Sequence, residues 1–84
     1  MGEKLPRLSG KEVIKILSKI GFKPIRQKGS HIILIKEDLS GKKSTVVPMH
    51  AEIDKGTLLE IIRQTGLNRE QFMDLLKWAS TNHL

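Results

Sequence analysis

The sequence predicts an α+β fold in which one helix is followed by a three-stranded antiparallel sheet and two further helices. Three observations predict it. Apolar residues recur at helical spacing near the start, three short predicted strands with tight links fill the middle, and capping signals mark two helices after residue 53. With 84 residues, the chain is long enough for one small domain, which we expect to span residues 1–84.

The first predicted helix begins after Ser9. Ser9 and Glu12 have the spacing of a capping box, in which each side chain accepts a hydrogen bond from the other residue's backbone amide. Val13 and Leu17 then mark an apolar stripe. Gly21 is well placed to end the helix in a left-handed conformation.

Three strands follow, joined by short links. Pro24 cannot donate to a strand ladder, so the first strand is expected at a sheet edge. Lys28-Gly29 is the predicted first turn, 37–43 the second, and Pro48 ends the third strand. Helices packed on one face would leave the other face of this sheet free for a partner. The predicted strands cover residues 22–28, 30–36 and 44–47.

Two helices close the chain. Asp54 is the predicted N-cap of the first, which Gly66 ends. Asn68 and Gln71 form a second capping box and open a short last helix. The residues that share its apolar face are Phe72, Leu75, Leu76 and Ala79.

Positive charge is concentrated in the first part of the chain. The formal net charge is +6. Residues 1–50 hold eleven Lys and Arg against four Asp and Glu, a net of +7, whereas residues 51–84 hold four against five, a net of −1. A local positive field on a small domain indicates a polyanionic partner, although solubility alone would also explain it. Three lysines spaced by four, Lys11, Lys15 and Lys19, make either a polyanion-binding line or an ordinary solvated face.

Composition excludes several classes of protein. The chain has no cysteine, which rules out disulfides, thiolate metal sites and a cysteine nucleophile, and fits a reducing, cytoplasmic location. No apolar run approaches the roughly 18–20 residues that span a membrane. Isolated acidic residues and scattered histidines lack metal-ligand spacing, and there is no Gly-rich phosphate loop. We therefore expect no metal, no cofactor and no membrane partner.

Histidine, the residue type that titrates near neutral pH, supplies the candidate catalytic groups. His31 starts the second strand and His50 follows the third, whereas His83 is near the C-terminus and is expected to have no role. If the second hairpin folds about Leu39–Ser40, His31 lies opposite Pro48 or Met49, and His50 reaches the same end of the sheet. A histidine on a strand is more often structural than catalytic, so this placement alone leaves the role open.

The first hairpin brings Arg26 and Lys28 to the same region. Two imidazoles beside several cations are what cleavage of an RNA phosphodiester needs: a base for the ribose 2′-OH, an acid for the leaving oxygen, and positive charge for the developing phosphorane. Ser30 lacks a base that would make it a nucleophile.

Five ordered blocks then carry a family resemblance. They are Gly21-Phe22; Arg26-Gln27-Lys28-Gly29-Ser30-His31; Val47-Pro48-Met49-His50; Lys55-Gly56-Thr57-Leu58; and 61–67 (Ile-Ile-Arg-Gln-Thr-Gly-Leu). In this order they resemble the HicA (YcfA-like) toxin family over about residues 9–76. The resemblance implies a double-stranded-RNA-binding-domain-like fold, α-β-β-β-α, to which this chain adds a C-terminal helix.

The resemblance also implies a function. HicA-like proteins are ribosome-independent, metal-independent mRNA endonucleases, the toxins of type II toxin–antitoxin systems, each inhibited by a HicB-type antitoxin. The family's catalytic histidine falls on His31. Ile32 departs from the family pattern, since many relatives have a second histidine or another polar residue there.

Other residues have weaker assignments. Gly29, Ser30 and His50 are candidate accessory residues around His31, and Gly29 has an equally good structural role in the turn. Gly56 and Thr57 could admit a phosphate at a helix N-terminus, or could serve packing and a local hydroxyl bond. Two other functions stay open: a non-catalytic RNA-binding module of the same fold, and a protein whose only partner is another protein.

Overall fold

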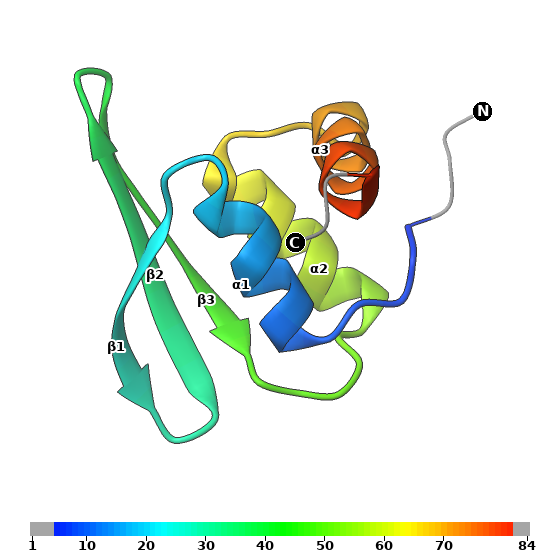
Figure 1. The fold of residues 1–84 in the computed structure, drawn as a ribbon. Helices are drawn as coiled ribbons and strands as arrows, with labels where there is room; N and C mark the ends of the chain where they lie inside the picture. Colours follow the sequence, from blue (N-terminus) through cyan, green and yellow to red (C-terminus); the bar gives the residue numbers. More distant parts are fainter. Residues whose placement is uncertain (1–4, 82–84) are drawn as a thin grey trace.

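A computed structural model describes residues 5–81 and confirms the predicted order of elements (Figure 1). His83 lies outside the described residues. Within residues 5–81, no helix combines the length and the apolar character needed to cross a membrane. The elements are α1 (Gly10–Ser18), β1 (Lys23–Lys28), β2 (His31–Asp38), β3 (Gly41–Pro48), α2 (Lys55–Thr65) and α3 (Arg69–Thr81).

The sheet is an antiparallel meander with β2 in the centre and β1 at an edge, as Pro24 predicts. The register of β1 shifts between Pro24 and Arg26, which leaves Ile25 in a bulge with 57% of its surface exposed. All six residues of β1 are exposed, so this strand projects beyond the cover of the helices.

The first turn differs from the prediction by one residue. Lys28 stays in the ladder, paired with His31, and the turn is Gly29-Ser30 rather than Lys28-Gly29. Gly29 supplies the positive φ, 61°, that this turn requires. The side-chain amide of Gln27 donates to the Gly29 carbonyl at 3.0 Å and braces the turn from the strand before it.

The second hairpin is longer than predicted. Ladder pairs run out to Asp38 and Gly41, so the turn is confined to Leu39–Ser40 and the predicted turn over 37–43 is mostly strand. The Asp38 carboxylate accepts hydrogen bonds from the Ser40 amide (2.9 Å) and hydroxyl (2.6 Å), which closes the tip. The same bonds lower the pKa of Asp38 below its usual range.

The helix boundaries follow the capping signals. Both partners of the Ser9–Glu12 box are bonded, and so are both partners of the Asn68–Gln71 box. Helix α1 ends at Ser18, earlier than predicted, and Gly21 takes the expected positive φ, 102°, in the turn that follows. Helix α3 is longer than predicted, with 13 residues.

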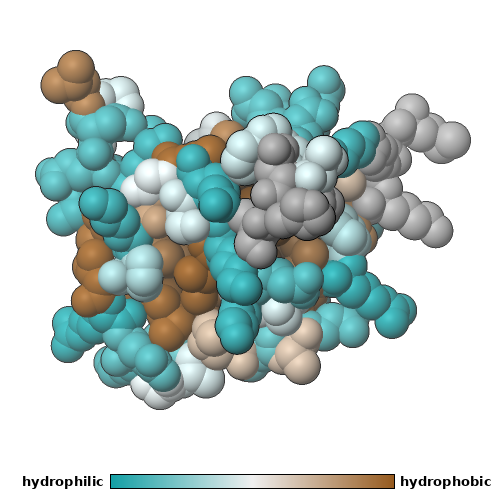
Figure 2. Space-filling view, viewed as in Figure 1, coloured by the Kyte–Doolittle hydropathy of each residue, from teal (hydrophilic) through white to brown (hydrophobic). Residues whose placement is uncertain are grey.

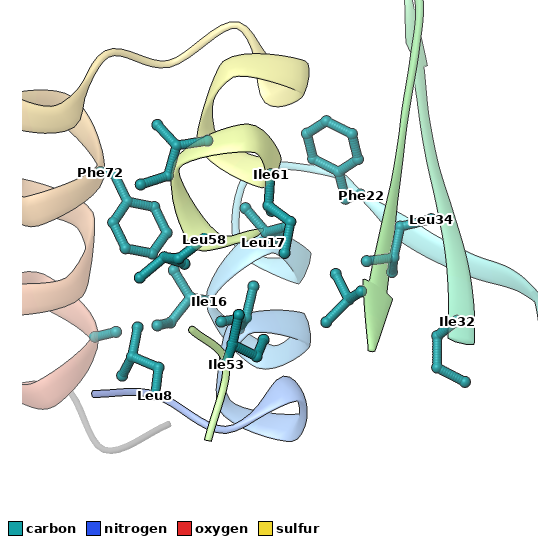
Figure 3. Close-up of a cluster of buried hydrophobic side chains, with 14 residues drawn as sticks. Leu8, Ile16, Leu17, Phe22, Ile32, Leu34, Ile53, Leu58, Ile61 and Phe72 are labelled. Carbon is teal, nitrogen blue, oxygen red and sulfur yellow. The ribbon is translucent and has the colours of Figure 1, made fainter. Parts of the chain in front are cut away.

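Three layers make up the molecule (Figure 1). Helices α1 and α2 pack against the sheet, mainly on β3, and α3 packs against α1 and α2 without contacting a strand. Figure 3 shows the resulting core between the helices and the sheet, with Phe22 between α2 and the strands and Phe72 reaching in from α3. Leu34 is fully buried there, and truncating such a residue to alanine typically costs about 2–5 kcal/mol.

Side-chain alternation along β2 divides the sheet into two faces. Ile32 and Leu34 point into the core, so His31, Ile33 and Ile35 lie on the face away from the helices. We call this second surface the open face. Val46, which pairs with Ile33, is 43% exposed on it. In Figure 2, hydrophobic atoms are visible among hydrophilic ones on the side where the sheet lies.

Candidate functional site

His31 occupies the first position of β2, directly after the Gly29-Ser30 turn, and its side chain is exposed. It pairs with Lys28 on β1 and with Pro48 on β3. The Met49 amide donates to the Ser30 carbonyl at 2.6 Å, next to the His31–Pro48 pair. His31 and Pro48 therefore form a non-hydrogen-bonded pair of the antiparallel ladder. The side chains of such a pair lie closer together than those of a hydrogen-bonded pair.

The structure brings His50 to the same end of the sheet. His50 is exposed and is the second residue of the loop between β3 and α2, two residues after Pro48. Two backbone hydrogen bonds hold this loop to the start of α1 and to the segment before it: the Gly10 amide donates to the His50 carbonyl at 3.0 Å, and the Ile53 amide donates to the Leu8 carbonyl at 2.8 Å. The chain after β3 is therefore fixed beside the start of α1.

The predicted cations divide between the two ends of the molecule. Lys28 faces His31 across the ladder and Arg26 pairs with Ile33, so both lie on the open face with His31. Lys11 follows Gly10 and is at the histidine end of α1. Lys19 caps the other end of that helix, about 12 Å further along the axis, with Lys15 between them. The structure thus puts Lys28 and Arg26 on one face with His31 and puts Lys11 next to the residue that contacts the His50 loop, whereas Lys19 lies at the far end of α1.

The first turn of α2 carries Gly56 and Thr57. The Asp54 carboxylate accepts from the Thr57 amide (3.2 Å) and from the Thr57 hydroxyl (2.7 Å), and these bonds lower the pKa of Asp54 below its ordinary value of 3.8. A phosphate approaching this helix end would meet an ionised carboxylate that already holds the Thr57 donors. The proposed RNA contacts of Gly56 and Thr57 stay predictions.

Two residues near the site were missed by sequence reasoning. Gln27 braces the turn before His31, and Gly10 packs against Pro48 and Met49. The sequence held a weak signal for Gly10, because glycine is a poor helix former and yet opens a capped helix. Nothing in the local sequence of Gln27 distinguishes a brace from an ordinary exposed strand residue.

An ion pair also joins this loop to the segment before α1. Arg7 lies 3.6 Å from Glu52, and both side chains are largely exposed, so this pair adds little to stability. Between residues 5 and 81, no group of three or more His, Cys, Asp or Glu is arranged to hold a metal ion.

A three-stranded meander with helices on one face and an exposed, cation-flanked histidine at its end defines a small α+β protein of the double-stranded-RNA-binding-domain-like class. Comparison with protein families narrows this class. The family model described as the HicA toxin of bacterial toxin–antitoxin systems matches residues 10–67, which is more than half of the chain. The chain therefore belongs to the HicA toxin family, as its sequence blocks predict, and is the toxin of a toxin–antitoxin pair. No significant match was found to a curated protein or to a solved structure.

Proposed function

We propose that this toxin is a ribosome-independent endonuclease of mRNA, acting in a type II toxin–antitoxin system with His31 as its general base. The observation that carries the proposal is the position of His31. Its imidazole is exposed at the end of the sheet, opposite Lys28 and beside the loop that carries His50. Membership of the HicA toxin family supplies independent support.

The reaction needs no group outside the RNA and the protein side chains. The His31 imidazole takes the proton of a ribose 2′-OH, and the 2′-oxygen attacks the adjacent phosphorus. The bond from phosphorus to the 5′-oxygen of the next nucleotide then breaks. The products are a 2′,3′-cyclic phosphate and a 5′-hydroxyl, after a proton reaches the leaving oxygen.

His50 and the cations have supporting roles in this proposal. His50 is the candidate donor of the proton to the leaving oxygen, or binds phosphate. Lys28 and Arg26 are placed to hold the phosphate and to stabilise charge that develops on it, because both share the open face with His31. Both belong to the part of the chain, residues 1–50, that carries the net charge of +7.

The proposed partner is a HicB-type antitoxin that covers His31. The open face offers aliphatic side chains, Ile33, Ile35 and Val46, bordered on β1 by Arg26 and Lys28. Apart from His31, the described open face has no aromatic side chain on which RNA bases would stack, so its aliphatic part suits a protein better than RNA. A partner with acidic residues would match the cations at its border.

His31→Ala should abolish RNA cleavage and growth arrest while the domain stays folded, since an exposed side chain contributes little to packing. Cleavage of a labelled RNA in vitro and thermal unfolding measure the two effects. His83→Ala is the matched control, because it removes another imidazole that we expect to have no role, and it should cleave as wild type. DNA should not be cut because it lacks the 2′-OH.

A folded His31→Ala protein that cleaves RNA at the wild-type rate would refute the assignment of the base. If neither the wild type nor the variant cleaves RNA but both bind it, the alternative of a non-catalytic RNA-binding module is correct.

Neutralising Arg26 and Lys28 together, as Arg26→Gln with Lys28→Gln, should weaken RNA binding and flatten its salt dependence. The slope of log affinity against log salt should fall by about 1.5, because each lost phosphate contact removes about 0.7–0.9. The control pair is Lys42→Gln with Arg69→Gln, which removes the same charge from exposed positions away from the site. Equal slopes for the two double variants would mean that Arg26 and Lys28 do not bind RNA phosphates and serve only solubility.

His50→Ala should reduce cleavage less than His31→Ala does, because water can replace an acid more easily than the positioned base. The antitoxin, taken as the protein encoded by the neighbouring reading frame, should shield both imidazoles from solvent. NMR titration of the histidines with and without that protein measures the shielding. If His50 titrates identically in the free and bound states, the two histidines do not share one covered site.

A further inference from the structure

Gly10 has an environment unlike that of the other described glycines. A methyl group at this position would lie 2.0 Å from the Pro48 carbonyl oxygen, 2.9 Å from the Pro48 carbonyl carbon and 3.0 Å from the Met49 Cα. All three are backbone atoms, which cannot move aside as a flexible side chain would. Four other glycines, Gly21, Gly29, Gly41 and Gly66, have a positive φ, whereas Gly10 does not. Glycine is therefore required at position 10 for space and not for backbone conformation.

The Pro48 carbonyl of β3, the strand that pairs with His31, occupies the space that a side chain at position 10 would need. In the His31–Pro48 pair, neither residue directs its backbone groups at the other, so the Pro48 carbonyl points away from β2. That carbonyl faces Gly10, at the position where a fourth strand would otherwise begin. The Gly10 Cα thus packs on the outer edge of β3, opposite the edge that contacts His31.

The same residue fixes the chain that carries His50. The Gly10 amide donates to the His50 carbonyl at 3.0 Å, and one residue earlier the Met49 amide donates to the Ser30 carbonyl at 2.6 Å. A short series of backbone contacts therefore links the turn before His31, the end of β3, the start of the His50 loop and the start of α1.

We propose that Gly10 is a positioning residue, which sets the loop of His50 against the strand end of His31 by a backbone contact that no side chain permits. The inference deepens the proposed ribonuclease function and rests on it for its consequence in catalysis. Its structural part stands on the contacts alone. With alanine at position 10, the start of α1 must move away from Pro48, and the His50 carbonyl loses its donor.

The test is Gly10→Ala, compared with the wild type at temperatures where both are folded. We expect kcat for RNA cleavage to fall between about tenfold and a hundredfold, the range that misplacement of a catalytic group produces, with KM little changed because Arg26 and Lys28 remain. The NMR signals of the Met49 amide and of the His50 imidazole should shift. Ile62→Val, a core truncation on α2, controls for lost stability and should keep both the wild-type kcat and these signals.

Substitution of a second glycine controls for the general effect of replacing a helical glycine with alanine, without the contact to Pro48 and Met49. Gly56 is also helical, but a methyl group there would meet only the Asp54 carboxylate, at an ordinary 3.4 Å. Gly56→Ala should leave the Met49 and His50 signals unchanged, and it serves as a structural control only, because Gly56 is a predicted RNA contact. Unshifted signals in Gly10→Ala, or a kcat equal to that of Ile62→Val, would overturn the proposal.

The positioning role of Gly10 can also be tested if the Gly10→Ala protein does not fold or if the wild type does not cleave RNA. If Gly10→Ala does not fold, scalar couplings across the hydrogen bonds from Gly10 to His50 and from Met49 to Ser30 can be measured in the wild type, and their absence would overturn the proposal. If the wild type does not cleave RNA, the proposed function fails, and the NMR comparison alone decides the positioning role.

Discussion

The register of β2 between its two neighbours is the constraint on which the rest of the molecule depends. Alternation along this strand buries Ile32 and Leu34 under the helices and puts His31 and Ile33 on the open face. A slip of one residue would reverse both sets, exposing the core leucine and burying the histidine. The energy that fixes the register comes from the core, since Leu34 is fully buried. The same packing therefore stabilises the fold and presents His31 to solvent.

The two ends of the sheet are built differently. At one end the β2–β3 hairpin closes with a two-residue turn whose tip is held by the Asp38 carboxylate. At the other end the Gly29-Ser30 turn, the end of β3 and the start of α1 are joined by backbone hydrogen bonds. Backbone contacts leave side chains free, which is why His31, Lys28 and His50 can all be exposed at an end that is structurally fixed.

Short-range sequence patterns were enough to predict the helices and strands, whereas several features that depend on contacts between distant residues were not predicted. Capping boxes at Ser9 and Asn68 depend on residues three apart, so the sequence contains the whole interaction. The point at which a hairpin turns depends on how far its two strands stay paired, which neither strand's own sequence determines. The predicted β2 and β3 were therefore too short, and the predicted first turn was wrong by one residue. Gly10 is the clearest case, because its neighbour Pro48 is 38 residues away in the chain and the contact is between backbones. The sequence predicted that His31 would lie opposite Pro48 or Met49, because a two-residue turn at Leu39–Ser40 sets the register of both strands, and the structure pairs His31 with Pro48.

The proposed ribonuclease activity depends on removal of a proton from a ribose 2′-OH by the His31 imidazole. The most direct measurement is mass spectrometry of the ends produced from a short RNA in the presence of a metal chelator, with and without a single 2′-deoxynucleotide at the cleaved linkage. If the 2′-oxygen is the nucleophile, the RNA gives 2′,3′-cyclic phosphate and 5′-hydroxyl ends, and the 2′-deoxy linkage is not cleaved. Ends carrying a 3′-hydroxyl and a 5′-phosphate, or cleavage at the 2′-deoxy linkage, would contradict this mechanism.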